Sequence, residues 1–183
     1  MKQFVVVSGL PASGKTTIAT GLAAELELPL LDKDAYLEAL LQHAGIGDLE
    51  WRHRLSRLAD EQLRSAASTR SAAVLASWWR HPKSNAETGT PTDWLNPTSD
   101  VIVEVHCVCR PSVAAARFLA RSRHPGHLDG RWSLERLLPI LEEQQSHGPL
   151  FPRQAILVDT EQPVEMQTLA QAVKAALHEI DDA

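Results

Sequence analysis

Residues 9–17 read GLPASGKTT, and the first eight of them match the pattern G-x-x-x-x-G-K-[ST] without a mismatch. Glycines in such a loop let the backbone wrap around an anion without Cβ clashes. The loop N–H groups and the start of the following helix attract phosphate oxygens, because both carry partial positive charge. The pattern therefore predicts a loop that binds the phosphates of a nucleotide, and a glycine-rich turn without a ligand is the alternative.

Each polar residue of this loop has an expected task. The Lys15 ammonium is expected to lie against the β- and γ-phosphates of ATP and to act in catalysis, and the Thr16 hydroxyl is expected to coordinate Mg²⁺. ATP and Mg²⁺ are therefore the predicted cofactors. The predicted nucleotide-binding residues are Gly9, Ala12, Ser13, Gly14, Lys15, Thr16 and Thr17.

Apolar runs alternate with amphipathic stretches along the rest of the chain. Residues 3–8 form a continuous apolar run, as expected of a central parallel strand that is covered on both faces. Strands that alternate with helices form a parallel sheet between two helix layers. The sequence thus predicts an α/β three-layer sandwich with a five-stranded parallel sheet, as one domain over residues 1–183. Further strands are expected at 28–31, 72–77, 101–108 and 155–158, and helices at 16–28, 35–42, 50–69, 112–121, 133–145 and 164–180.

The amino-acid composition bears on which molecules the protein can bind and on where in the cell it is expected. The formal net charge of −5 argues against a protein that binds nucleic acid over a broad basic face. No run approaches the roughly 20 apolar residues of a membrane span, and no signal peptide is recognisable, so a cytoplasmic protein is expected. Cys107 and Cys109 are expected on one face of a buried strand, as small core residues rather than metal ligands.

Asp32 and Asp34 follow the second predicted strand, at the carboxyl edge where open α/β sheets bind their ligands. One carboxylate could reach the metal shell beside Thr16. The other could accept a hydrogen bond from an acceptor hydroxyl and take its proton. The alternative is that these aspartates only cap the next helix, since Asp is favoured at that position.

The segment GLPASGKTT, followed by LPLLDKD and a helix, resembles shikimate kinase, gluconate kinase and their relatives in the nucleoside-monophosphate-kinase-like branch of P-loop proteins. It also resembles the kinase domain of polynucleotide kinase and chloramphenicol phosphotransferase. The resemblance implies an ATP-dependent phosphotransferase with an alcohol group as acceptor. It further implies that Asp34 contacts the acceptor hydroxyl as base or orienter, and that Asp32 lies near Mg²⁺. Its specific motifs lie within residues 9–34, and its general layout covers the whole chain.

Three features depart from the patterns of these families. Shikimate kinase has a glycine triplet after its third strand, where this chain has ASWWR at residues 76–80, which argues against shikimate as the acceptor. Polynucleotide kinase has an arginine shortly after its acid, where this chain has Leu37, which weakens a 5′-hydroxyl nucleic-acid acceptor. No acid ends the third strand, so the usual Walker B carboxylate is absent from the sequence pattern.

Two loops are expected to border the reaction site. The segment RSRHPGHLDGR predicts a mobile lid at about 122–131, with Arg121 and Arg123 stabilising the transferring phosphoryl group. The alternative for these arginines is a solvated basic helix end. An extended loop at about 78–97 is expected in the acceptor region, where its tryptophans either line the acceptor pocket or anchor the loop. Arg52, Arg54 and Arg57 are expected on a solvated helix face, and a cationic contact with the acceptor is the alternative.

Three functions remain open on these residues, and the first is favoured. It is an ATP-dependent kinase that phosphorylates a hydroxyl group of a small molecule. The second is a polynucleotide or nucleotide kinase, against which the acidic charge and Leu37 count. The third is a P-loop ATPase or regulatory nucleotide-binding protein without kinase activity. Asp34 and the arginine-rich lid count against the third, because a simple switch needs no acceptor base.

Overall fold

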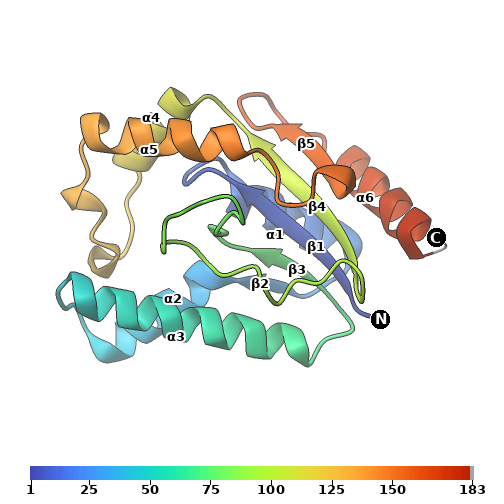
Figure 1. Cartoon of the computed structure of the whole chain (residues 1–183), viewed down its shortest axis with the longest axis horizontal. Helices are drawn as coiled ribbons and strands as arrows, with labels where there is room; N and C mark the ends of the chain where they lie inside the picture. The colour runs from blue at the N-terminus through green and yellow to red at the C-terminus, as the bar shows by residue number, and fades with distance from the viewer. Residues whose placement is uncertain (182–183) are drawn as a thin grey trace.

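The computed structural model describes residues 1–181 and has a central sheet between two layers of helices (Figure 1). All five strands are parallel, in the spatial order β2-β3-β1-β4-β5. The α/β sandwich with a five-stranded parallel sheet, predicted from the alternation of strands and helices, is therefore confirmed. The strands are β1 Gln3–Gly9, β2 Leu30–Asp32, β3 Ala72–Ala76, β4 Val101–Val108 and β5 Ala155–Asp159.

Six α-helices of the described chain cover and flank this sheet. Helices α2 and α3 pack on each other next to β2, and α4 packs on α5 (Figure 1). Helix α1 packs on α6, with α1 against β1 and β3 and α6 against β4. None of the helices within residues 1–181 is long and apolar enough to cross a membrane. The helices are α1 Lys15–Leu26, α2 Lys33–Ala44, α3 Leu49–Ser68, α4 Pro111–Ala120, α5 Leu134–His147 and α6 Met166–Asp181.

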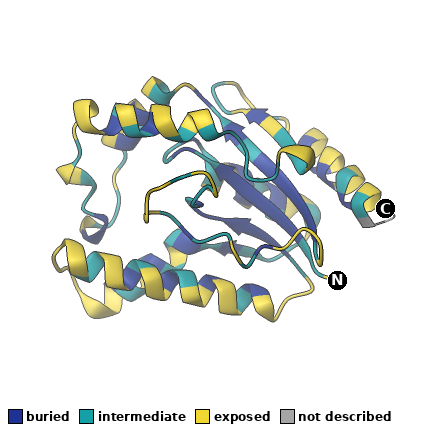
Figure 2. Cartoon of the chain, viewed as in Figure 1, coloured by how far each residue is buried: buried dark blue, intermediate teal, exposed yellow. Residues whose placement is uncertain are grey.

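Strand β1 lies in the middle of the sheet and is buried on both faces (Figure 2). Successive residues of a strand point to opposite faces, so Val5 and Val7 enter one core while Phe4 and Val6 enter the other. The first core includes residues of α1 and α6, and the second includes residues of α3. This two-sided burial explains the continuous apolar run, and it fixes the loop that follows β1 firmly at the carboxyl edge of the sheet.

Several helices and strands begin or end one or two residues from their predicted positions, because of the local backbone conformation. Helix α1 ends at Leu26 because Glu27 adopts the left-handed conformation, with φ of 54°. Strand β2 consequently begins at Leu30, not at residue 28, and it ends at Asp32. Asp32 is thereby the last residue of the strand and also the N-cap of α2.

The two cysteines lie in different cores, so the prediction that they share one strand face was wrong. Strand β4 ends at Val108, and the chain beyond it turns away from the sheet. Cys107 packs in the core beneath α1 and α6, whereas Cys109 packs with residues of α4 and α5. Both are buried free thiols, and burial raises the pKa of Cys107 to about 12. The predicted role as small core residues fits this protonated, enclosed state.

Candidate active site

The loop between β1 and α1 has the backbone shape of an anion-binding cradle. Gly9 and Gly14 adopt positive φ angles of 126° and 92°, and Ala12 has a φ of 59°. A Cβ atom at Gly9 would lie 2.4 Å from the carbonyl oxygen of Cys107, so only glycine fits there. The motif residues thus form the tight turn that their pattern predicts.

Two side chains of this loop lack the partners that a phosphate would supply. The Ser13 hydroxyl is buried and has no hydrogen-bond partner within the described chain. The Lys15 ammonium donates to the carbonyl oxygens of Gly9 and Leu10, at 3.1 and 2.6 Å. Burial lowers the pKa of Lys15 to about 8, although the Asp34 carboxylate opposes the shift. An anionic ligand would give the Ser13 hydroxyl a hydrogen-bond partner and would stabilise the charged form of Lys15. The loop residues therefore fit a nucleotide with its Mg²⁺.

Asp32 links the loop to the start of α2. Its carboxylate accepts a hydrogen bond from the Asp34 backbone N–H at 2.9 Å and another from the Thr16 hydroxyl at 3.2 Å. The helix-cap alternative is therefore confirmed for Asp32, while its contact with Thr16 places two oxygen ligands side by side. Burial raises the pKa of Asp32, and the neighbouring Asp34 carboxylate adds to the shift. A divalent cation between Asp32 and Thr16 would favour the ionised form.

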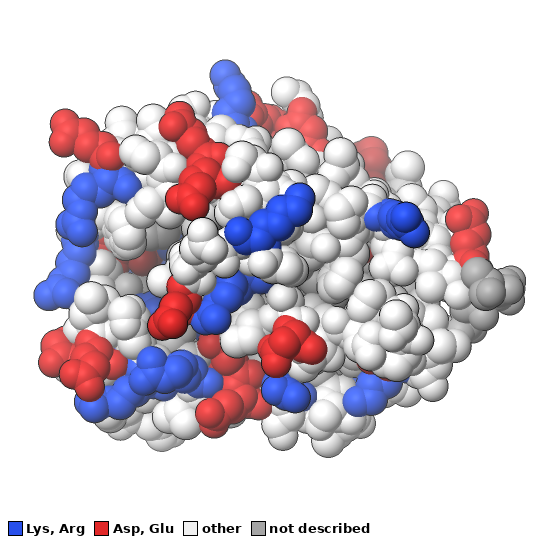
Figure 3. Space-filling view, in the orientation of Figure 1, with Lys and Arg blue, Asp and Glu red and all other residues white. Residues whose placement is uncertain are grey.

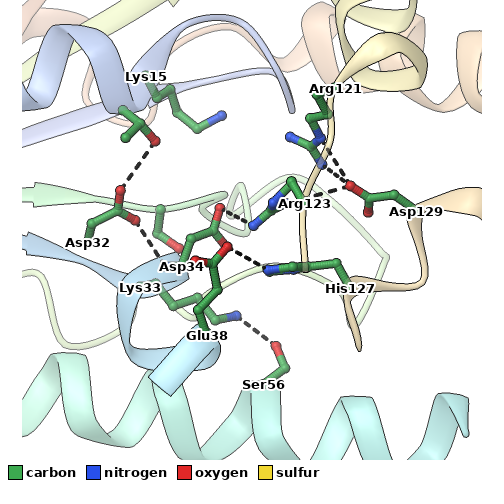
Figure 4. Close-up of polar contacts among 12 residues, drawn as sticks. Lys15, Asp32, Lys33, Asp34, Glu38, Ser56, Arg121, Arg123, His127 and Asp129 are labelled. Carbon is green, nitrogen blue, oxygen red and sulfur yellow. Dashed lines mark hydrogen bonds and ion pairs between the residues drawn. The ribbon is translucent and has the colours of Figure 1, made fainter. Parts of the chain in front are cut away.

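Asp34 lies in the first turn of α2 and pairs with an arginine of the predicted lid (Figure 4). The Arg123 guanidinium lies 2.7 Å from its carboxylate. Burial by itself would raise the pKa of Asp34, but the charges of Arg123, His127 and Lys15 hold it below the usual value. Asp34 is therefore a carboxylate at neutral pH.

Arg121 contributes a second cation from the same segment. Its guanidinium pairs with Asp129 at 3.0 Å and lies 4.1 Å over the Phe118 ring. Arg123 also approaches Asp129, at 3.9 Å. Lys15, Asp34, Arg121 and Arg123 come from three elements and point toward one another around one space (Figure 4). The structure thus brings together all four residues that were predicted to be catalytic.

A second contact holds the lid against α2, and sequence analysis did not find it. His127 Nε2 lies 3.1 Å from the Glu38 carboxylate, one helical turn beyond Asp34. Gly126 lies against Leu41, where a Cβ atom would come within 2.5 Å of Cδ2. The four-residue spacing puts Asp34 and Glu38 on one helix face, but nothing in the sequence pairs that face with His127. The lid itself contains two short 3₁₀ turns, at Pro125–His127 and Asp129–Arg131.

Some arginines of α3 lie on the surface, and one lies near the candidate site. Arg54 forms an exposed pair with Glu50, and Arg57 is exposed, as predicted for a solvated face. That prediction was wrong for Arg52. Burial lowers the pKa of Arg52, and its guanidinium lies within electrostatic range of Asp34 and Arg123. Arg52 faces inward because it lies on the side of α3 that packs against α2.

The tryptophans of the 78–97 loop have different roles. The Trp79 indole is buried and donates to the Val7 carbonyl oxygen at 3.0 Å. Trp94 packs on it, with ring centroids 6.1 Å apart, so both anchor the loop on the sheet. Trp78 is half-buried and lines a pocket. Of the two roles considered from the sequence, anchoring therefore applies to Trp79 and Trp94, while Trp78 and Trp79 both line the pocket.

Acidic and basic side chains are interspersed over the face of the molecule that Figure 3 shows. No extended patch of one sign covers this face. This distribution agrees with the formal net charge of −5 and differs from the basic stripe of a typical nucleic-acid-binding surface.

Comparisons with known proteins agree with this architecture. Residues 4–131 match the P-loop protein family described as an AAA domain. A presumed kinase from Chloroflexus aurantiacus J-10-fl is 27% identical with a TM-score of 0.76, over 96% of this chain and 98% of that one. A sugar kinase from Janibacter sp. HTCC2649 is 23% identical with a TM-score of 0.53, over 100% of this chain and 96% of that one.

The shikimate kinase from Acinetobacter baumannii, solved in complex with shikimate, is more distant. It is 17% identical with a TM-score of 0.50, over 98% of this chain and 94% of that one. At such identities the likeness to this enzyme and to the sugar kinase concerns the fold alone. No curated protein matches the sequence. The resemblance to the shikimate and gluconate kinase group is thus supported by fold and family together.

Proposed function

The chain belongs to the P-loop family described as an AAA domain, and from this we propose that it is an ATP-dependent kinase that phosphorylates a hydroxyl group of a small molecule. The observation that carries the proposal is the convergence of Lys15, Asp34, Arg121 and Arg123 beside the phosphate loop. The three cations of this cluster can bind phosphate, and its carboxylate can take a proton. A nucleotide switch needs only the first.

ATP and Mg²⁺, when bound, would supply the phosphoryl group and the metal charge that polarises it. The metal ligands would be the Thr16 hydroxyl and Asp32, which already share a hydrogen bond. The loop backbone would cradle the phosphates, with Lys15 as the point charge. The residues that would hold the nucleotide are Gly9, Ala12, Ser13, Gly14, Lys15, Thr16 and Thr17.

Asp34 would orient the acceptor and take its proton. An ionised carboxylate is required for that work, and the lowered pKa of Asp34 keeps it ionised at neutral pH. The hydroxyl proton would pass to a carboxylate oxygen of Asp34 as the acceptor oxygen bonds to the γ-phosphorus, and ADP would leave with the electron pair of the broken P–O bond. Arg123 occupies that carboxylate in the structure, so the acceptor must displace or share it.

The lid arginines would stabilise the charge that develops during transfer. Arg121 and Arg123 lie in a partly enclosed site, where a guanidinium stabilises negative charge more strongly than in water. In this proposal residues 1–183 form one kinase domain, with a lid at about 122–131 and an acceptor-region loop at about 78–97.

The test is an acceptor screen. The purified protein is incubated with ATP and Mg²⁺ and, in turn, with sugars and polyols, hydroxylated antibiotics, nucleosides and 5′-hydroxyl oligonucleotides. Transfer of labelled γ-phosphate to a small molecule, lost in Asp34→Asn, would support the proposal. Transfer to oligonucleotides or nucleosides alone would replace it with the nucleic-acid alternative. ATP hydrolysis that no acceptor stimulates and that Asp34→Asn leaves unchanged would favour a regulatory ATPase.

A further inference from the structure

A pocket outside the Asp34 cluster adjoins the phosphate loop. The empty space in and above it, open solvent included, is about 660 Å³. Its walls come from the end of β4, the loop after β3 and the last turns of α5, and Ser8, Gly9 and Leu10 close it on the phosphate-loop side. The Lys15 ammonium is bonded to the carbonyl oxygens of Gly9 and Leu10. A molecule in this pocket would therefore contact Gly9 and Leu10, the two residues whose carbonyl groups hold the Lys15 ammonium.

Three buried polar atoms of the pocket lining have no hydrogen-bond partner. They are Arg80 Nε, Gln144 Oε1 and His147 Nδ1, and the described chain holds only five such side-chain atoms altogether. A buried polar atom without a partner costs about 1–3 kcal/mol, and native proteins satisfy almost all of them. Their concentration in one pocket points to a bound molecule that completes the hydrogen bonds.

His106 adds a fourth polar group, and its neighbours set its tautomer. The Ser8 hydroxyl donates to the fully buried Glu104 carboxylate, so the Ser8 oxygen is free to accept from His106 Nδ1, 2.7 Å away. With the proton on Nδ1, the lone pair of the neutral ring lies on Nε2. No residue within 1–181 forms a hydrogen bond to Nε2, and the ring lines the pocket. His106 is thus an oriented hydrogen-bond acceptor for a ligand.

The side chains that line the pocket determine which kind of molecule can bind in it. Arg80 Nε can only donate, His106 Nε2 and Gln144 Oε1 accept, and a hydroxyl group can satisfy all three because it both donates and accepts. The half-buried Trp78 offers an apolar ring face for the C–H side of a ring or chain. No Asp or Glu side chain lines the pocket, since Glu104 lies beneath it and binds Ser8 and the backbone. An ammonium group would find no counter-charge there.

We propose that this pocket binds the phosphate acceptor and that the acceptor is a polyhydroxylated compound without an amino group. This rests on the proposed kinase function and adds the substrate class to it. The residues that select the acceptor are Arg80, His106, Gln144 and His147, with Trp78 as the stacking face. Asp34 keeps its proposed part in proton transfer.

The first measurement is binding without nucleotide, so that it does not depend on catalysis. Ligand-observed NMR with myo-inositol, D-glucose, D-gluconate and D-glucosamine compares neutral, acidic and amino polyols at equal concentration. We expect binding of at least one of the first three and at least tenfold weaker binding of glucosamine. Glucosamine binding as tight as that of glucose, or no binding by any probe, would overturn the inference.

The second measurement locates the site with variants of one helix. Gln144→Met and His147→Phe keep the side-chain bulk and remove the polar atoms, so each should raise the Kd and the acceptor KM about 3- to 10-fold. Glu142→Gln, exposed on α5 and outside the pocket, is the matched control and should leave both unchanged. Circular dichroism melting curves check that each variant folds, and Gln144→Asn serves as the milder replacement if one does not.

The outcomes separate this inference from the proposed function. If polyols gain phosphate while both pocket variants keep the wild-type Kd and KM, the kinase proposal stands and the pocket assignment is overturned. If polyols bind in a way that depends on Gln144 but never gain phosphate, the pocket is supported as a polyol site, and it is the kinase proposal that fails.

Discussion

The Arg123 guanidinium lies 2.7 Å from the Asp34 carboxylate, so the proposed base is paired with the lid in the ligand-free protein. In the proposed reaction Asp34 would therefore have two competing partners, the lid arginine and the acceptor hydroxyl. The pair keeps the carboxylate ionised, and it also places Arg123 beside the position that the transferred phosphoryl group would occupy. Recognition of the acceptor and placement of the lid are thus linked through one side chain.

Asp34→Asn should bind ATP nearly normally and transfer phosphate about 10²–10⁴-fold more slowly, because asparagine keeps the shape but cannot take a proton. The measurement is kcat with the true acceptor, alongside the Kd for ATP. Asp32→Asn is the companion variant, and its defect should appear as a higher Mg²⁺ requirement, since Asp32 lies against Thr16. Full transfer by Asp34→Asn would mean that this residue only stabilises the start of α2.

Lys15→Ala should abolish ATP-dependent activity and leave the fold intact. The Lys15 ammonium contacts only backbone carbonyl groups of its own loop, so its loss removes phosphate binding without opening the core. Isothermal titration with ATP and a thermal melt measure the two effects. Unchanged ATP binding and turnover in this variant would refute the nucleotide site.

Arg123→Ala should lower kcat more than it raises the KM for ATP, because its contact with the phosphoryl group strengthens in the transition state. Arg121→Ala should behave in the same way. Arg131→Ala is the matched control, since Arg131 is an exposed arginine of the same lid. Wild-type kinetics in both Arg121→Ala and Arg123→Ala would leave these residues as surface charge alone.

ATP binding should weaken as the pH rises from 7 to 9. The pKa of Lys15 in the free protein is lowered to about 8, so above that pH the free side chain is neutral and must gain a proton to bind phosphate well. The Kd should then rise by up to about tenfold per pH unit. Lys15→Arg, which stays charged throughout, should lose this dependence. A flat profile in the wild type would contradict the prediction.

Glu104→Gln should destabilise the fold by about 2–4 kcal/mol. The buried carboxylate accepts from the Leu150 and Phe151 N–H groups, at 3.0 and 2.6 Å, and an amide would turn its own N–H₂ toward one of them. Urea unfolding measures the loss, with the exposed Glu142→Gln as control. The pKa of Glu104 is lowered by its hydrogen bonds despite burial, so its contribution should be lost as the pH falls below about 4.5.

The sequence predicted those parts of the site that depend on neighbours along the chain. The phosphate loop contains the glycines, and the Asp32–Asp34 segment the capping aspartate, that determine their local structure. The five strands are marked by their apolar runs. The inward turn of Arg52 and the contact between Glu38 and His127 depend on how α3 and the lid pack on α2. Such contacts join residues up to 89 positions apart, and local patterning holds no information on them.

The pocket was missed for the same reason. His106 was part of an apolar run, and Gln144 and His147 were polar residues of a surface helix. They line one pocket only because α5 lies next to the end of β4 in the folded protein. A single clue was present in the sequence, since Glu104 and His106 interrupt a strand that is otherwise apolar. Polar residues two apart in a buried strand share a face and call for partners.

The order of the strands also bears on how the chain folds. Strand β1 precedes both of its neighbours, β3 and β4, in the chain, and Gln3 pairs with Ala72 and Val101. Parallel pairing over such separations is slow, because a long chain must close before any contact forms. During synthesis the apolar β1 strand has no partner until residues 72–76 have been made, and its second edge stays open until residues 101–107 follow. Its unpaired edges are then open to other chains, so a chaperone that shields β1 would raise the yield of folded protein.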